Sequence, residues 1–149
     1  MTNLIAEKSI EIAAPASAVW NVLTARTSEW SGLFGAKGPV ESDWKPGSEV
    51  LWRNADGVVY VNGRVLASEP SKLLRFSVRS TQREMQPVSG RAEDDITQTY
   101  ALAEHGGRTT LSIAHGDFRN LAKGEEIYPA VVAGWDTLLA KFKELSESA

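Results

Sequence analysis

The chain has 149 residues, no cysteine and a formal net charge of −3 at pH 7. This length is typical of one domain and is enough to bury a substantial core without the help of disulfides or structural metals. The lack of cysteine excludes disulfides, iron–sulfur clusters, thiolate zinc sites and a cysteine nucleophile. The slightly acidic balance argues against a nucleic-acid-binding protein, which normally has a basic face. We therefore expect a single domain over residues 1–149.

The sequence shows neither of the two common patterns of membrane or export segments. No N-terminal stretch combines basic residues with an apolar run, and no window is apolar over eighteen residues. A secretory signal and a membrane-spanning helix would each need such a pattern. Together with the lack of cysteine, this predicts a cytoplasmic protein, monomeric or homodimeric, with no membrane insertion.

The first third of the chain predicts one strand followed by one or two short helices. Residues 4–12 alternate between apolar and polar with a period of two, which is typical of a half-buried strand. Residues 14–24 have apolar side chains at helical spacing behind Pro15, a residue type favoured at helix starts. Residues 25–47 are rich in Gly, Ser, Trp and Pro, with room for a short helix around residues 28–33.

From residue 47 onward, the pattern predicts strands joined by turns. Asp56-Gly57 is a strong signal for a tight hairpin turn, and a longer polar loop over residues 81–93 interrupts the series. Consecutive hairpins give an antiparallel sheet with one apolar face. The expected strands cover residues 48–54, 58–68, 73–80, 95–104 and 109–115.

The last segment has the pattern of a long amphipathic helix. Pro129 is tolerated in its first turn, so we expect the helix to begin near Glu125 or Glu126. Gly134 lowers helix stability by roughly 1 kcal/mol relative to alanine, and we expect it to allow close approach or bending of the helix over the sheet. The apolar stripe recurs every three or four positions: Ile127, Val131, Trp135, Leu138, Phe142 and Leu145.

Together these elements predict an α+β fold in which a curved antiparallel sheet of about six strands wraps around the C-terminal helix. Three segments are distinctive: Ala14-Pro15 with Val19-Trp20 and Leu23-Thr24; Gly63-Arg64-Val65-Leu66 with Glu69-Pro70 and Leu74-Arg75-Phe76; and residues 110–118 with Gly134-Trp135 and Leu138-Leu139. These segments and the element order resemble the START/birch-pollen-allergen superfamily, also called SRPBCC or helix-grip. The third is similar to its AHSA-like branch, named after activators of the heat-shock chaperone ATPase, which overlaps the polyketide cyclase group.

The resemblance implies a cavity between the inner face of the sheet and the long helix, a geometry that suits apolar ligands with a few polar anchors. Strand parity puts Gln98 beside Ile96 and Tyr100, and it puts His115 beside Ile113. Buried amides and imidazoles need hydrogen-bond partners, so we expect both polar side chains to line the cavity. The full set of expected lining residues is Trp52, Phe76, Gln98, Tyr100, His115, Tyr128, Val131, Trp135 and Leu138.

Some orientations stay open at this stage. On residues 58–68 the odd positions look buried, but a slip of one residue would turn Tyr60, Asn62 and Arg64 into the cavity. Large apolar groups in loop-rich sequence are either tucked under the loop or placed around a portal, and three residues leave this choice open: Trp30, Phe34 and Trp44.

The first functional hypothesis is the binding of a small hydrophobic molecule: a lipid, a polyketide or an aromatic metabolite. The alternative is a cyclase or dehydratase of the polyketide type, in which Gln98 or His115 moves protons. A module that interacts with a chaperone is the second alternative implied by the resemblance. The spacing of His105 and His115 does not make a metal site, and no phosphate-loop or nucleophile-elbow motif occurs, so we expect neither a metal nor a cofactor.

Overall fold

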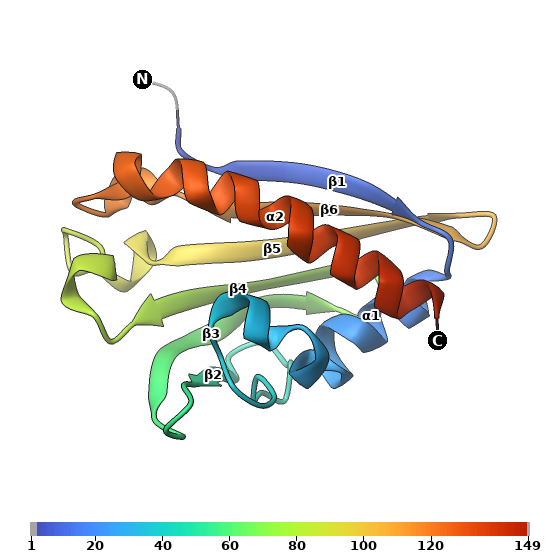
Figure 1. Ribbon diagram of the computed structural model, residues 1–149, viewed down its shortest axis with the longest axis horizontal. Helices are drawn as coiled ribbons and strands as arrows, with labels where there is room; N and C mark the ends of the chain where they lie inside the picture. Colours follow the sequence, from blue (N-terminus) through green and yellow to red (C-terminus); the bar gives the residue numbers. More distant parts are fainter. Residues whose placement is uncertain (1–2, 149) are drawn as a thin grey trace.

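The computed structural model describes residues 3–148, so residues 1, 2 and 149 of the expected domain lie outside the described residues. Six strands and two α-helices occur in this range (Figure 1). They are β1 (Ala6–Ile12), α1 (Ala16–Ala25), β2 (Glu49–Arg53), β3 (Val59–Glu69), β4 (Leu73–Ser80), β5 (Ile96–His105), β6 (Arg108–Gly116) and α2 (Gly124–Glu147). Two short 3-10 helices, η1 (Thr27–Glu29) and η2 (Ser31–Phe34), follow α1 where a short helix was expected.

The strands form one antiparallel sheet in the order β1-β6-β5-β4-β3-β2. Strands β2 to β6 follow the chain as hairpins, and β1 closes the far edge by pairing with β6. In Figure 1, α2 crosses one face of this sheet, and η2 lies over the same face near β3. The predicted α+β helix-grip architecture is confirmed.

The start of α2 differs from the prediction. The helix begins at Gly124, which places Pro129 in its second turn and not in its first. Proline has no N–H, so the carbonyl of Glu125 loses its partner within the helix. Both residues are exposed, and water can therefore satisfy that carbonyl. The helix therefore tolerates Pro129 in its second turn, because this end of the helix is exposed to water.

Cross-strand register brings the inward-facing residues of the central strands into a row. Phe76 of β4 pairs with Gln98 of β5, and Gln98 pairs with His115 of β6. Directly opposed residues on one face have Cβ atoms about 4.5–5.5 Å apart. The sheet therefore places Gln98 and His115 side by side on the face that α2 covers.

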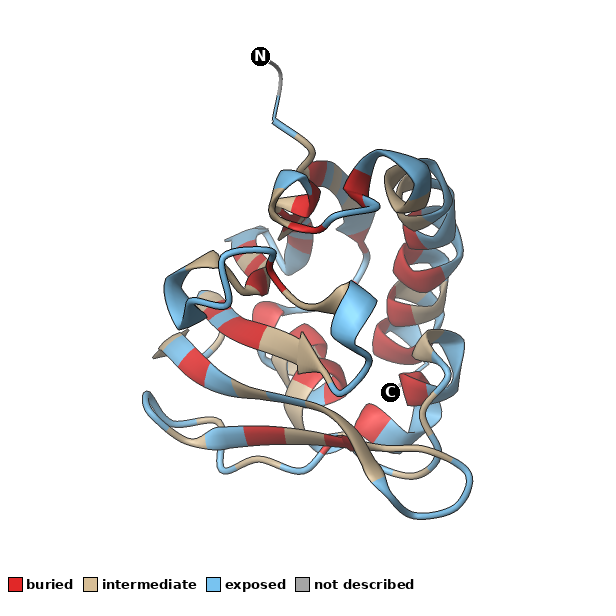
Figure 2. Ribbon diagram, turned by 90° about the vertical axis from the view of Figure 1, so that its left-hand side faces the viewer, coloured by how far each residue is buried: buried red, intermediate tan, exposed pale blue. Residues whose placement is uncertain are grey.

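Two hydrophobic clusters lie between the sheet and the helices. The buried side of α2 faces the sheet (Figure 2). The larger cluster is rich in aromatic residues, among them the fully buried Trp30, Phe76, Tyr100, Trp135 and Phe142. The smaller cluster lies near the N-terminal end of α2 and is built on Ile96, Phe118 and Leu121. Fully burying one large apolar side chain stabilises a fold by about 1.5–3 kcal/mol, so these two clusters supply much of the stability.

Gly134 does not have the packing role expected from its position in the helix. It is exposed, and a Cβ atom added there would meet nothing within 4 Å. The expectation of a close approach over the sheet was therefore wrong, because this side of α2 faces away from the core. Gly134→Ala is expected to raise the free energy of unfolding by about 1 kcal/mol, the difference in helix propensity. Urea denaturation followed by far-UV circular dichroism would measure it.

Gly124, in the same helix, provides the opposite control. A Cβ atom there would lie 1.6 Å from the carbonyl oxygen of Phe118, so the backbone would have to move. Gly124→Ala is expected to lower the free energy of unfolding by about 1–3 kcal/mol, as overpacking usually does. Equal effects of the two substitutions would contradict this account of the helix.

Candidate functional site

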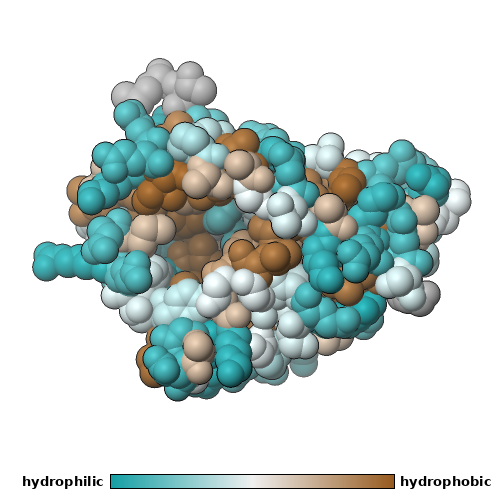
Figure 3. Space-filling view, in the orientation of Figure 1, coloured by the Kyte–Doolittle hydropathy of each residue, from teal (hydrophilic) through white to brown (hydrophobic). Residues whose placement is uncertain are grey.

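A cavity of about 290 Å³ lies between the two hydrophobic clusters, under the first turns of α2. Trp135 and Phe142 fill the space over the sheet farther along this helix. In its first turns α2 instead carries Ile127 and Val131, whose shorter side chains border open space. The cavity reaches the surface as a hollow with hydrophobic walls (Figure 3).

Most of the cavity wall is apolar. Val78 of β4 and Ile96 of β5 form part of the floor, and Phe118 and Leu121, from the segment after β6, form one side. Met85, from the loop after β4, also borders the space. No Asp, Glu, Lys or Arg side chain among the described residues lines it. A wall of this kind favours an uncharged ligand, because a buried charge without a partner is strongly disfavoured.

Gln98 is the first polar group of the wall, and it is only 3% exposed. Its Oε1 accepts a hydrogen bond from the hydroxyl of Tyr100 at 2.7 Å. Burial raises the pKa of Tyr100, so this hydroxyl stays protonated and donates. Within residues 3–148 no hydrogen bond uses the Nε2 group of Gln98, although Gln98 borders the cavity. The amide therefore has a free N–H donor at the cavity wall.

His115 is the second polar group, and its protonation follows from its neighbours. The indole Nε1 of Trp135 donates to Nδ1 of His115 at 3.0 Å. An indole nitrogen can only donate, so Nδ1 must be unprotonated. Burial, which includes edge contacts with the rings of Phe118 and Trp135, lowers the pKa of His115 to about 4. The imidazole is therefore neutral at pH 7 and carries its proton on Nε2.

Trp52 is the third. Its Nε1 is buried without a hydrogen-bond partner, and within residues 3–148 only the Oγ of Ser146 shares that condition among side chains. The residue is 3% exposed and borders the cavity. An unsatisfied buried donor lowers stability by about 1–3 kcal/mol. The residue Trp52 borders the cavity, but its Nε1 is covered by protein.

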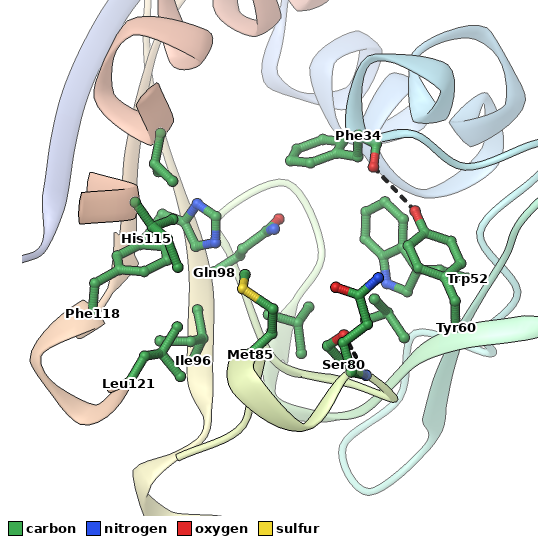
Figure 4. A pocket seen from close by; sticks show the side chains of 15 residues that line it. Phe34, Trp52, Tyr60, Ser80, Met85, Ile96, Gln98, His115, Phe118 and Leu121 are labelled. Carbon is green, nitrogen blue, oxygen red and sulfur yellow. Dashed lines mark hydrogen bonds between the residues drawn. The ribbon is translucent and has the colours of Figure 1, made fainter. Parts of the chain in front are cut away.

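Tyr60 resolves the open question about β3. Its hydroxyl donates to the carbonyl of Phe34 at 3.0 Å, and both rings border the cavity (Figure 4). Asn62 and Arg64 are exposed, while Val65 is buried, so the odd-numbered set faces inward along this part of the strand. Tyr60 reaches the cavity near the start of β3, where the pairing with β2 shifts register.

The open question about the loop aromatics has a different answer for each residue. Trp30 is tucked under its loop, and its Nε1 donates to the carbonyl of Val22 at 2.8 Å. Trp44 is half-buried, with Nε1 donating to the carbonyl of Thr24 at 2.9 Å. Of the three, Phe34 alone borders the cavity. Its ring packs against Trp52 and Trp135, with centroid distances of 5.2 and 5.8 Å.

The expected lining residues divide into two groups. Those that border the cavity are Trp52, Gln98, His115 and Val131. The expectation was wrong for Phe76, Tyr100, Tyr128, Trp135 and Leu138, which do not line it. Four of these five are buried in the larger hydrophobic cluster, where Phe34 from η2 packs against Trp135. Tyr128 is half-buried, and its hydroxyl donates to the carbonyl of Ile5 at 3.0 Å, away from the cavity.

Several lining residues were missed. Val78 shares strand parity with Phe76, and Ile96 shares it with Gln98, so parity alone could have identified both. Met85, Phe118 and Leu121 come from segments between regular elements, where no periodic signal exists. Their positions depend on how those segments fold back over the sheet.

The described residues contain no metal centre. Within 3–148, no three or more His, Cys, Asp or Glu side chains are grouped so as to hold a metal ion. In the same range, neither helix combines the length and the apolar character needed to cross a membrane.

Residues 13–147 match the protein family described as Activator of Hsp90 ATPase homolog 1-like protein. The chain belongs to this family. The resemblance to the AHSA-like branch, seen in the residue segments, is thereby confirmed. Comparison with curated proteins gives no match.

Solved structures share the fold of this family member at low sequence identity. ChR145 from Cytophaga hutchinsonii is 25% identical, with a TM-score of 0.69 over 99% of this chain and 97% of that chain. The Aha1 dimer from Colwellia psychrerythraea is 15% identical, with a TM-score of 0.72 over 99% and 97%. DynU16, from the dynemicin biosynthetic locus, is 17% identical, with a TM-score of 0.72 over 96% of this chain and 47% of that chain.

Proposed function

We propose that this chain, acting as one domain, binds a small apolar molecule in the cavity under α2. The observation that carries the proposal is an apolar cavity with an open mouth and free polar donors in its wall. Ligand pockets commonly measure about 300–1,000 Å³ and are lined mainly by hydrophobic and aromatic groups. The cavity lies at the small end of that range, which favours a compact molecule of one or two rings over a long lipid chain.

Val131 offers a direct test, because it borders the cavity from α2. Val131→Phe adds a ring that fills part of the space, and it is expected to weaken binding at least about tenfold, or by 1.4 kcal/mol. Isothermal titration calorimetry with a panel of flavonoids, aromatic polyketides and fatty acids would measure the dissociation constants. The native tryptophan fluorescence, to which Trp52 contributes from the cavity wall, provides a second signal.

Ala130 is the matched control, since it is the exposed neighbour of Val131 on the same helix. Ala130→Phe is expected to leave every dissociation constant unchanged. The proposal fails if no compound of the panel saturates the wild type, or if Val131→Phe binds as tightly as Ala130→Phe.

A polyketide cyclase or dehydratase activity is the alternative, supported by the likeness to DynU16 and by the polar groups at Gln98 and His115. It predicts that Gln98→Ala or His115→Ala abolishes turnover while the fold stays intact. Interaction with a chaperone and formation of a homodimer stay predictions, supported by the family description and by the Colwellia Aha1 dimer. A cytoplasmic location likewise stays a prediction of the sequence.

A further inference from the structure

The polar groups of the cavity wall differ in which hydrogen-bond donors and acceptors they leave free for a ligand. Tyr60 uses its hydroxyl proton on the carbonyl of Phe34, and Oγ of Ser80 accepts from the backbone N–H of Gln82 at 3.0 Å. Gln98 uses its oxygen on Tyr100, and His115 uses Nδ1 on Trp135. What remains free on these last two side chains is in each case an N–H group. The buried side chains of Gln98 and His115 therefore offer unused donors, while the exposed Gln82 also has an amide oxygen that can accept.

The free donors of Gln98 and His115 lie together on the sheet. Gln98 and His115 are cross-strand neighbours, so their N–H groups come from adjacent points of the sheet. Trp52 belongs to β2, three positions away from β5 in the strand order, and its unpartnered Nε1 is covered by protein and not accessible from the cavity. Figure 4 shows Gln98 and His115 side by side, with Trp52 across the cavity from His115. A molecule that lies between them meets the two N–H donors at one end and the ring of Trp52 at the other.

The neutral state of His115 decides which kind of ligand group these donors can bind. A protonated imidazole would be a cation and would favour an anionic ligand, whereas a base with a free lone pair would favour a proton donor. The bond from Trp135 removes the lone pair at Nδ1, and the neutral ring presents only an N–H group at Nε2. Among residues 3–148 no Asp, Glu, Lys or Arg side chain lines the wall, so a bound carboxylate would exchange its hydration for neutral donors alone, which is unfavourable.

We infer that the ligand is a neutral ring compound that carries a carbonyl oxygen at one end. This oxygen accepts from Nε2 of Gln98 and Nε2 of His115. This inference rests on the proposed function, because it names the class of molecule that the same cavity selects. It also gives His115 a definite role: the imidazole is a hydrogen-bond donor that polarises a carbonyl, and it does not act as a base.

The test compares probes that differ in their oxygens and share one ring system. These are 1,4-naphthoquinone, with two carbonyls, naphthalene, with none, and 1-naphthoate, with one charged carboxylate. The chain has no cysteine, so the quinone meets no thiol. By calorimetry, the quinone is expected to bind at least about tenfold more tightly than naphthalene and naphthoate, since matched hydrogen bonds discriminate by roughly 1.4 kcal/mol or more.

Variants of His115 assign the preference to the donor. His115→Phe removes the N–H group and is expected to abolish the preference for the quinone over naphthalene. His115→Gln can accept from Trp135 through its oxygen and donate to the ligand through its amide, so it is expected to keep the preference. His105→Phe, in the exposed turn after β5, is the control for a lost histidine and is expected to behave like the wild type.

The outcomes separate this inference from the function on which it rests. If naphthalene and the quinone bind equally well, the cavity binds apolar molecules and the carbonyl inference is wrong. If naphthoate binds most tightly, the inference of a neutral ligand is wrong. If no probe binds to the wild type, both the inference and the proposed function are wrong.

Discussion

Trp30→Ala is expected to lower the free energy of unfolding by about 3–5 kcal/mol, the usual range when a large buried aromatic side chain is removed. Trp30 is 2% exposed, and its ring meets Phe34, Trp52 and Phe142 edge-on at centroid distances of 5.8, 6.0 and 5.3 Å. Its Nε1 also donates to the carbonyl of Val22, which alanine would leave without that partner. Urea denaturation followed by circular dichroism would measure the loss.

Leu33 is the matched control for this prediction, because it lies in the same segment but is 49% exposed. Leu33→Ala is expected to change the free energy of unfolding by no more than about 0.5 kcal/mol, as surface substitutions usually do. Since Phe34 and Trp52 border the cavity, Trp30→Ala should also weaken ligand binding. A loss below about 1 kcal/mol would contradict the central position of Trp30 in the core.

Acidification from pH 7 to pH 4.5 is expected to lower the free energy of unfolding by about 2.5 kcal/mol through His115 alone. Burial lowers the pKa of His115 from 6.5 to about 4 in the folded protein. Below pH 6.5 the unfolded chain binds a proton that the folded protein does not bind, so acid favours unfolding. The contribution is fully present above pH 6.5 and is lost as the pH falls towards 4.

Two variants isolate this contribution. His115→Gln keeps an acceptor for Trp135 but cannot titrate, so its stability is expected to change much less between pH 7 and pH 5. His105→Gln, in the exposed turn, is expected to keep the pH dependence of the wild type. Arginine partners lower the pKa of some carboxylates, such as Glu11 beside Arg108 and Asp117 beside Arg119. Protonation of these carboxylates therefore lowers stability at a lower pH than protonation of His115 does. Equal slopes for the two variants between pH 7 and pH 5 would contradict the assignment.

The regular elements were predictable because their patterns are local. The expected strand over residues 73–80 coincides with β4, and the alternation of residues 95–104 corresponds to β5. The same parity placed Gln98 and His115 on the inner face, where they border the cavity. The position of Gly134 in α2 was also clear, but its role was not, because local spacing does not say how far the sheet lies from each side of a helix.

Residues of the cavity wall were harder to predict than residues of the core. Strand parity distinguishes inward from outward, and both Phe76 and Gln98 face inward. It does not tell which inward residue touches empty space. That depends on Phe34 at the end of η2, whose ring packs against Trp52 and Trp135. Trp52 lies 18 residues after Phe34 in the sequence, and Trp135 lies about a hundred residues after it.

The sequence by itself determined the helix-grip order of elements, the apolar stripe of α2 and the inward position of the two polar residues that flank each other on β5 and β6. Each of these follows from a period of two or 3.6 along the chain. Only the tertiary structure decided where the cavity lies, which residues it leaves in the core, and which nitrogen of His115 carries the proton. These depend on contacts between distant segments: Phe34 against α2, and the indole of Trp135 against the imidazole.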